Sequence, residues 1–398
     1  MRIEPAEKTR NITYAIRDVV LAANELKKRG KKVLHLNIGN PNIFDFEPPK
    51  HMIDAVYKAM IENKNGYADS HGLEEAREAI VNDIAKKGVK AEIEDVLIGM
   101  GVSEIIELCL SALVNPGENF LVPKPGYPLY NAVSWKLHCT PNFYELDEEN
   151  NWEPNLEDIK NKINEKTKAI IIINPNNPTG SVYSRKTLEG LLEIAEENNL
   201  VVFSDEIYDK IILDNDEHIS LASLSKEVPV VTMNGLSKNY LAPGWRIGWC
   251  IFTGEGISDF KEAVFKLARA RLSAPHPFQY AIKPALEGPQ DHLKEMNKKL
   301  KERRDLTYKR LNEIEGLSLV KPKGAFYAFP KLDYEIENDM KFVLDLLYKK
   351  QILVVPGTGF AHHKPDHFRL VFLPQKEVLG EAYNKLEEYI LENLQNFK

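Results

Sequence analysis

The chain has 398 residues, of which 43% are hydrophobic and 28% are charged, and its formal net charge is -7. This composition is typical of a folded protein of about two domains and excludes a largely disordered chain. The acidic balance argues against the basic face that nucleic-acid-binding proteins use, so we expect small-molecule partners and no nucleic acid.

The cysteines and the apolar segments bear on the compartment. Three cysteines lie far apart and lack any CxxC spacing, which favours neither a disulfide framework nor a zinc site. No apolar run approaches the roughly 20 residues that cross a bilayer, and the first ten residues are charged where a signal peptide needs an apolar segment. We therefore expect a cytoplasmic protein without a membrane segment.

The first 45 residues predict one helix and one strand. Apolar residues recur at helical spacing over 12–26, and Gly30 follows as a stop signal. Residues 33–38 are typical of a strand, which ends in a loop that starts at Gly39. A glycine there lets the backbone come close to a ligand.

Strands and helices alternate from about residue 95 to 251, which predicts an α/β domain with a mostly parallel sheet. Residues 95–98 form the first expected strand, and the turn Gly99-Met100-Gly101 leads into a helix with Ser103 as its N-cap. Such a turn binds phosphate through free N–H groups. A dinucleotide site is the alternative interpretation, but the third glycine of GxGxxG is missing.

Three later loops carry polar and aromatic side chains to the ends of expected strands. Tyr127 and Tyr130 stand in a proline-rich loop, where they either stack on a flat ring or pack in the core. The β-branched run 168–173 is typical of a strand buried on both faces, and it ends in the amide-rich loop 174–180. Asp205 directly follows another buried strand, so its carboxylate needs a cationic partner such as a protonated pyridine nitrogen.

Lys238 lies in a loop between two expected strands, 228–232 and 246–251. A lysine that loses solvent beside other cations gives up its proton easily and forms a Schiff base with an aldehyde. Arg246 is such a cation and also suits a phosphate. Together they indicate pyridoxal 5'-phosphate (PLP), although a surface lysine and a strand-edge arginine remain the alternative for these two residues taken alone.

Beyond Gly254 the pattern changes to long helices and short strands, which predicts a smaller α+β domain completed by residues up to 45. The three histidines His362, His363 and His367 lie close together in one loop and suggest a metal-binding site. This loop has no partner cysteine or carboxylate pattern in the sequence, so we expect no metal site.

Four motifs stand in one order: NPNNPTG at 174–180, SDEIY at 204–208, SKNYLAPGWRIGW at 237–249 and HFRLVF at 367–372. Over nearly the whole chain this order resembles the class I/II aminotransferases, PLP enzymes of fold type I. The stretches GMGVSE at 99–104, VPKPGYPLY at 122–130, IINPNNPTGSVYS at 172–184 and FSDEIYDKI at 203–211 are most similar to the alanine aminotransferases.

The resemblance implies an α/β fold with a mostly parallel, seven-stranded type of sheet. The expected division is an N-terminal arm over 1–45, a large PLP-binding domain over 46–290 and a small C-terminal domain over 291–398. The implied reaction transfers the amino group of L-alanine to 2-oxoglutarate, giving pyruvate and L-glutamate by a ping-pong mechanism through pyridoxamine phosphate. A homodimer with active sites at the subunit interface is also implied.

The resemblance also implies roles at the PLP ring. Lys238 is expected to form the Schiff base with PLP and then to move the substrate's proton between Cα and C4′. Asp205 would keep the pyridine nitrogen protonated, so that the ring accepts electrons. Tyr208 and Asn177 would hydrogen-bond the phenolic oxygen, and Tyr127 would stack on the ring.

The remaining implied roles concern the phosphate and the substrate carboxylate. The expected phosphate ligands are Arg246, Ser103, Ser237 and the N–H groups of Gly101 and Val102, with Tyr67 reaching the phosphate of the neighbouring subunit. Arg369 would hold the substrate carboxylate in bidentate fashion, assisted by Gly39 and Asn177. Many relatives carry Ser or Thr where this chain has Gly235, which leaves the Ser237 contact open.

Other functions of the same fold stay open at this point. An aspartate or aromatic amino-acid aminotransferase, a synthase or a lyase would share the cofactor motifs. A PLP-sensing regulator would carry a DNA-binding module before the aminotransferase-like part. The residues before Phe46 account for one helix and one strand, so we expect no such module.

Overall fold

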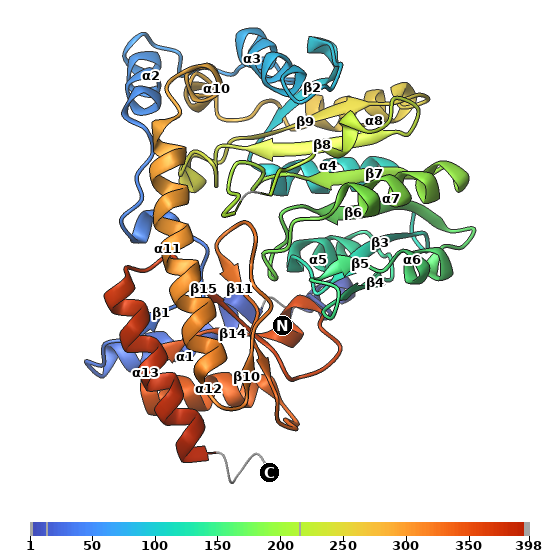
Figure 1. Cartoon of the computed structure of the whole chain (residues 1–398). Helices are drawn as coiled ribbons and strands as arrows, with labels where there is room; N and C mark the ends of the chain where they lie inside the picture. Colours follow the sequence, from blue (N-terminus) through green and yellow to red (C-terminus); the bar gives the residue numbers. More distant parts are fainter. Residues whose placement is uncertain (1–2, 13–14, 215, 394–398) are drawn as a thin grey trace.

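The computed structural model describes residues 3–12, 15–214 and 216–393, and a large mixed sheet forms its centre (Figure 1). Within the described residues this sheet has eight strands in the order β2-β9-β8-β7-β6-β3-β4-β5. The strands from β8 to β4 run parallel, whereas β9 is antiparallel to β2 and β8, and β5 is antiparallel to β4. Their bounds are β2 Val96–Gly99, β3 Asn119–Lys124, β4 Asn142–Asp147, β5 Glu153–Pro154, β6 Thr167–Ile173, β7 Val201–Asp205, β8 Val230–Gly235 and β9 Gly248–Thr253.

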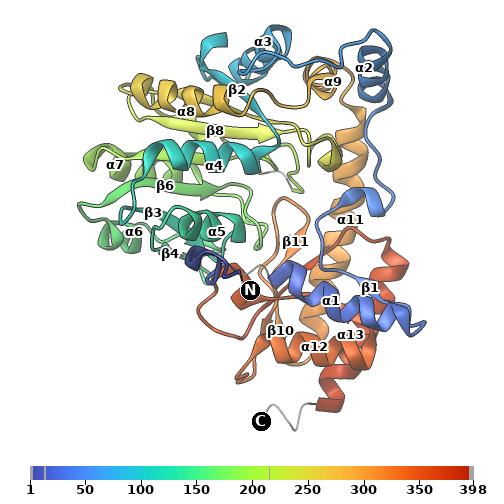
Figure 2. The ribbon, with the colours of Figure 1, turned by 180° about the vertical axis from the view of Figure 1, so that it is seen from behind.

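Strand β6 explains why the sheet is covered on both faces. Ile170 and Ile172 pack into one apolar core, whereas Ile171 and Ile173 pack into another on the opposite face. Successive side chains of a strand point to opposite faces, so a run of β-branched residues needs helices on each side. Figures 1 and 2 show these two helical layers, with α7 on one face and α4 on the other.

The helices of this part are α2 Lys50–Ile61, α3 Glu74–Ala85, α4 Val102–Leu113, α5 Pro128–Lys136, α6 Leu156–Lys162, α7 Arg185–Glu197, α8 Ser258–Ala270, α9 His276–Gln279 and α10 Ile282–Glu287. None of the helices in the described part of the chain has both the length and the apolar character of a bilayer span.

The C-terminal part forms a second core together with the N-terminal segment. Strand β1 (Leu34–His35) pairs in parallel with β13 (Ile352–Leu353), and Val19 and Leu34 share a core with Leu300 and Phe368. The other elements are α1 Ala15–Lys28, α11 Asp291–Glu313, α12 Asp339–Lys350, α13 Lys376–Asn393, β10 Leu317–Ser318, β11 Tyr327–Ala328, β12 Lys331–Leu332, β14 Val355–Pro356 and β15 Phe368–Val371.

We propose the domain division that the sequence predicts, with 46–290 as the large domain and 291–398 as the small domain to which 1–45 belongs. Residues 19–36 share a core with residues 296–390, which supports this grouping. Several side chains of the large domain pack against the same core: Phe46, Ile207, Tyr208, Ile211, Leu213 and Leu241.

The predicted elements recur in the structure, but several strands are shorter than predicted. The strand expected over 324–329 is reduced to Tyr327–Ala328 because Ala325 has a left-handed backbone with φ of 54°, which interrupts the extended chain. The strand expected over 33–38 is reduced to Leu34–His35, whose partner β13 is equally short.

Candidate active site

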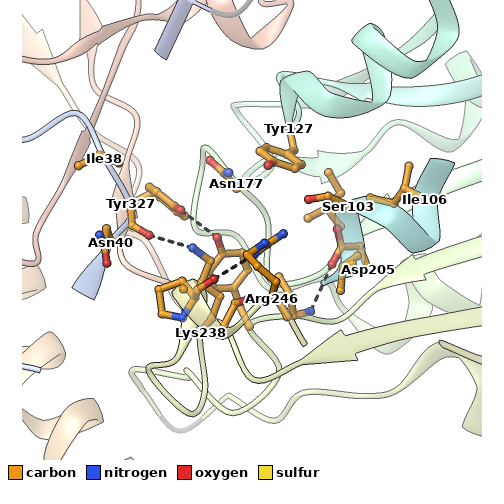
Figure 3. Close-up of a pocket in the computed structure, with 18 of the residues that line it drawn as sticks. Ile38, Asn40, Ser103, Ile106, Tyr127, Asn177, Asp205, Lys238, Arg246 and Tyr327 are labelled. Atoms are coloured by element: carbon orange, nitrogen blue, oxygen red, sulfur yellow. Dashed lines mark hydrogen bonds between the residues drawn. The ribbon is translucent and has the colours of Figure 1, made fainter. Parts of the chain in front are cut away.

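A cavity of about 550 Å³ lies at the carboxyl ends of β6 and β7, where the small domain meets the large one (Figure 3). This edge is the usual ligand-binding position of open α/β sheets. The lining includes Ile38, Gly39, Asn40, Val102, Ser103, Ile106, Tyr127, Asn177, Asp205, Tyr208, Ser237, Lys238, Arg246, Tyr327 and Arg369.

The cavity brings together most of the residues that the sequence singled out. Eleven of the thirteen predicted site residues line it: Gly39, Val102, Ser103, Tyr127, Asn177, Asp205, Tyr208, Ser237, Lys238, Arg246 and Arg369. Gly101 lies beside the Arg246 guanidinium rather than in the lining. Tyr67 is 81% exposed and is not part of the lining of its own subunit.

Lys238 is the centre of the cavity's electrostatics. Its Nζ donates a hydrogen bond of 2.8 Å to the Gly39 carbonyl oxygen and lies 5.6 Å from the centre of the Phe326 ring. Loss of solvent, and then the positive charges of Arg369 and Arg246, lower the pKa of Lys238 to about 8, against the smaller opposing effect of Asp205. Near neutral pH an appreciable fraction of this amine is therefore unprotonated.

Asp205 ends β7 and is buried, with 4% of the residue exposed. Burial raises its pKa to about 6, although the Tyr130 hydroxyl donates to Oδ2 at 3.1 Å and the Ile207 N–H donates to Oδ1 at 3.3 Å. A buried carboxylate whose pKa is raised by loss of solvent is stabilised by any cation that enters the site. This is the environment that the sequence predicted for a partner of a protonated ring nitrogen.

Tyr327 belongs to the site although the sequence did not single it out. The Tyr327 hydroxyl oxygen lies 2.8 Å from the Tyr208 hydroxyl oxygen. A Cβ at Gly39 would lie only 2.2 Å from the Tyr327 hydroxyl oxygen. Burial and the neighbouring Tyr327 raise the pKa of Tyr208 well above its ordinary value. Residues 324–329 were predicted only as a strand, and because all of them are buried, no alternation in that stretch distinguishes Tyr327 from its neighbours.

The glycine turn before α4 and the Arg246 side chain form a polar cradle. Gly101 is the residue that precedes the helix, with φ of 74°, so the prediction of Ser103 as the N-cap was wrong and Ser103 lies in the first turn. A Cβ at Gly101 would lie 2.6 Å from Nη2 of Arg246, so the missing side chain of Gly101 makes room for the guanidinium. The first N–H groups of a helix attract anions, and a phosphate fits here.

Arg246 itself departs from the prediction that it begins a strand. It adopts a left-handed backbone with φ of 55° after the turn Pro243–Trp245, and β9 begins only at Gly248. Its guanidinium donates to the carbonyl oxygens of Pro243 at 3.0 Å and Met100 at 3.3 Å. These two bonds bring the loop of Lys238 against the glycine turn.

Arg369 reaches the cavity from β15 of the small domain. Nη1 donates to Asn177 Oδ1 at 3.3 Å, and Nη2 donates to the Asn37 carbonyl oxygen. The guanidinium carbon lies 4.7 Å from the ring centres of both Tyr327 and Phe360. The two rings and the amide hold the guanidinium in one orientation, as bidentate binding of a carboxylate requires.

The histidines near the C-terminus are surrounded by carboxylates, contrary to the argument from sequence spacing. His367 lies between Asp366, with Nδ1 to Oδ1 at 2.7 Å, and Glu148, with Nε2 to Oε1 at 3.2 Å, and His362 Nε2 lies 3.3 Å from Asp366. Despite burial, these carboxylates raise the pKa of His367. Both ring nitrogens of His367 thus have carboxylate partners, and the absence of a metal stays a prediction.

The comparisons with known proteins agree with this geometry. The family model described as aminotransferase class I and II matches residues 31–386. The chain belongs to the class I and II aminotransferases. It is 44% identical to the glutamate-pyruvate aminotransferase AlaA of Haemophilus influenzae, over 98% of this chain and 99% of that protein.

Two solved structures extend the comparison. The alanine aminotransferase from Pyrococcus furiosus is 48% identical with a TM-score of 0.96, covering 98% of this chain and 100% of that chain. The aspartate aminotransferase from Thermotoga maritima is 31% identical with a TM-score of 0.89, covering 97% of this chain and 100% of that chain. The predicted fold type I is confirmed, and the enzyme is PLP-dependent like its family.

The residues present fit this cofactor. Gly101 leaves space for a cation beside a helix N-terminus, which suits the phosphate. Asp205 is a buried carboxylate whose pKa is raised by loss of solvent, which suits a protonated ring nitrogen, and the lowered pKa of Lys238 suits an amine that reacts with an aldehyde. We therefore retain all thirteen predicted residues as candidate site residues.

The cradle makes a testable prediction for Gly101→Ala. The added Cβ would displace the flexible Arg246 guanidinium from the cradle, so we expect the apparent Kd for PLP to rise about tenfold or more, the scale of one lost charge-assisted hydrogen bond. Fluorescence titration of the cofactor-free protein with PLP measures this change.

Gly117→Ala is the matched control for that measurement. Gly117 also has a left-handed backbone, with φ of 85°, but a Cβ there meets nothing within 4 Å. Both variants place a Cβ on a backbone with positive φ, which is unfavourable for a residue other than glycine. Equal PLP affinities of the two variants would contradict the cradle.

Proposed function

We propose that the enzyme transfers the amino group of L-alanine to 2-oxoglutarate, producing pyruvate and L-glutamate. The observation that carries this proposal is the Lys238 amine, held at a lowered pKa between two arginines at the carboxyl edge of the sheet. The names of the H. influenzae and P. furiosus relatives support the choice of substrates.

The arginines of the cavity support a small amino acid as one substrate. Among the described residues that line it, the arginines are Arg246 and Arg369, and Arg246 belongs to the phosphate cradle. That leaves Arg369 for the α-carboxylate, the group common to alanine, glutamate and their oxo acids. An aspartate or aromatic aminotransferase is the second candidate, because the T. maritima aspartate aminotransferase has the same fold.

The roles of the side chains follow from their positions. PLP supplies an aldehyde that takes up the amino group and an electron-accepting ring, and it alternates between its aldehyde and amine forms in a ping-pong cycle. Asp205 would hold the proton on the ring nitrogen, Tyr208 and Asn177 would hydrogen-bond the phenolic oxygen, and Tyr127 would stack on the ring. The proposed phosphate ligands are Arg246, Ser103, Ser237 and the N–H groups of Gly101 and Val102.

Arg369 and Lys238 would act on the substrate. Arg369, assisted by Asn177 and Gly39, would bind the carboxylate and thereby fix the direction of the bonds at Cα. Lys238 Nζ would then remove the Cα proton. Positioning and proton transfer thus come from two different domains.

Steady-state assays test the substrate assignment. With 2-oxoglutarate as acceptor, we expect kcat/KM for L-alanine to exceed that for L-aspartate and L-tyrosine. Lys238→Ala should lower kcat by about a thousandfold or more, because it removes the proton-transferring group. Arg369→Gln should mainly raise KM, because it removes the carboxylate ligand. Equal or higher values for aspartate or tyrosine would overturn the alanine proposal and leave the fold unaffected.

We also propose a cytoplasmic homodimer in which Tyr67 reaches the partner's phosphate site. The three cysteines are free, as in a reducing compartment. Apolar side chains gather on α2 and the segment after it, where Tyr57 is 66%, Ile61 70% and Tyr67 81% exposed. Exposed apolar surface of this kind favours a protein interface.

Sedimentation equilibrium tests the dimer. The native protein should have twice the subunit mass of 45.4 kDa, and Tyr57→Lys combined with Ile61→Lys should dissociate it because two charges enter the interface. Tyr348→Lys, at a residue 47% exposed on α12, is the control and should remain dimeric. A monomeric native protein with full activity would contradict the shared site.

A further inference from the structure

We propose that Asp209 is a positioning residue, whose buried carboxylate fixes the loop of Lys238 against the segment that carries Asp205 and Tyr208. The inference rests on the role proposed for Lys238. Asp209 follows Tyr208 directly, and its side chain is 1% exposed. The cavity lining does not include it, so it would act through other residues.

One oxygen of Asp209 binds the chain on both sides of Lys238. Oδ1 accepts a hydrogen bond of 2.9 Å from Asn234 Nδ2 and one of 2.6 Å from Asn239 Nδ2. Asn234 lies near the end of β8, and Asn239 follows Lys238 directly. The six-residue span 234–239, which contains Lys238, is therefore closed on a single carboxylate.

Further hydrogen bonds join the same loop to the segment that carries Asp205. Asn239 Oδ1 accepts from the Lys210 N–H at 3.4 Å, and Asn234 Oδ1 accepts from the Gly235 N–H at 2.8 Å. On the same segment the Glu206 N–H donates to the Met233 carbonyl oxygen at 2.9 Å. Side-chain and backbone bonds thus hold residues 205–210 and 233–239 side by side.

The negative charge of Asp209 is balanced by Lys87, which is not part of the cavity lining. Lys87, from the turn after α3, donates to Oδ2, and its Nζ lies 3.9 Å from Glu206. Burial alone would raise the pKa of Asp209, but the charges of Lys87, His218 and Lys210 outweigh it and hold the pKa well below its ordinary value. The carboxylate therefore keeps both acceptors charged, which makes its bonds to the two amides stronger than neutral ones.

This network explains how a loop can place Nζ accurately. Loops are usually the more mobile parts of a fold, and a misplacement of about 1 Å at a reacting group can cost about a hundredfold in rate. The Lys238 amine donates its hydrogen bond to the Gly39 carbonyl oxygen, in the segment that belongs to the other domain. Its place relative to Asp205 is set by the two asparagines and Asp209.

The test compares Asn239→Ala with Tyr383→Phe. Asn239→Ala removes one bond to Asp209 and leaves the Lys87 pair intact, whereas Tyr383→Phe removes a buried hydrogen bond of 2.6 Å to Thr307, in the small domain. Both should lower thermal stability to a similar extent. Asp209→Asn serves as a second variant, because it keeps the shape and removes the charge.

The first readout needs neither cofactor nor substrate. In the cofactor-free protein we expect Asn239→Ala to speed amide hydrogen exchange over residues 235–242 and to leave residues 291–313 unchanged. The second readout is kinetic on the PLP-loaded enzyme. There kcat should fall about tenfold or more, while KM for L-alanine changes less than about threefold.

The outcomes separate positioning from general stabilisation. Exchange and kcat in Asn239→Ala that match those of Tyr383→Phe would overturn the proposal, as would Asp209→Asn with the kcat of the native enzyme. If the native enzyme does not act on alanine, the proposed function fails. The exchange measurement still decides whether Asp209 fixes the loop.

Discussion

The site depends on keeping one amine partly unprotonated inside a pocket that is otherwise positively charged. Lys238 lies near Arg246 and Arg369, and loss of solvent together with these two charges lowers its pKa to about 8. Each charged neighbour of Lys238 also has a proposed role in binding. In the proposed function the arginines would bind the two anionic groups of cofactor and substrate, and Asp205 is a carboxylate in the same cavity lining. Removal of any one of them changes the proton affinity of the amine as well as a binding contact.

The pocket exists only while the two domains keep their relative position. Arg369 and Tyr327 come from the small domain, and they meet Asn177 and Tyr208 of the large one. Helix α11 holds this arrangement with a buried arginine: Arg304 pairs with Asp214 of the large domain at 2.7 Å. Because the Arg304 side chain is fully buried, loss of Asp214 would remove a charge partner that the guanidinium cannot replace with water. The charged helix α11 therefore carries an interdomain contact.

Local patterns in the sequence indicated the central strands of the sheet and several cavity residues, whereas β4 and β5 were not predicted and the role of Arg369 came from the family resemblance. The run of residues 168–173 has to be a strand covered on both faces, and polar residues that end such strands meet at one edge, which places Asn177 and Asp205 together. Contacts that depend on tertiary packing were not accessible in this way. Nothing local to Tyr327 indicates that it meets Tyr208, and the carboxylates beside His367 include Glu148, 219 residues away in the chain. Ser103 was misassigned as the N-cap because Gly101, two residues earlier, caps the helix with a positive φ.

The most direct test of the central claim is the pKa of Lys238 in the cofactor-free protein. Acylation of the Lys238 amine by a small reagent, followed by mass spectrometry of its peptide as a function of pH, measures the fraction that is unprotonated. The account predicts a half-maximal rate near pH 8. A midpoint near the ordinary lysine value of 10.5 would contradict it, because the enclosure and the two arginines would then have no effect on the amine.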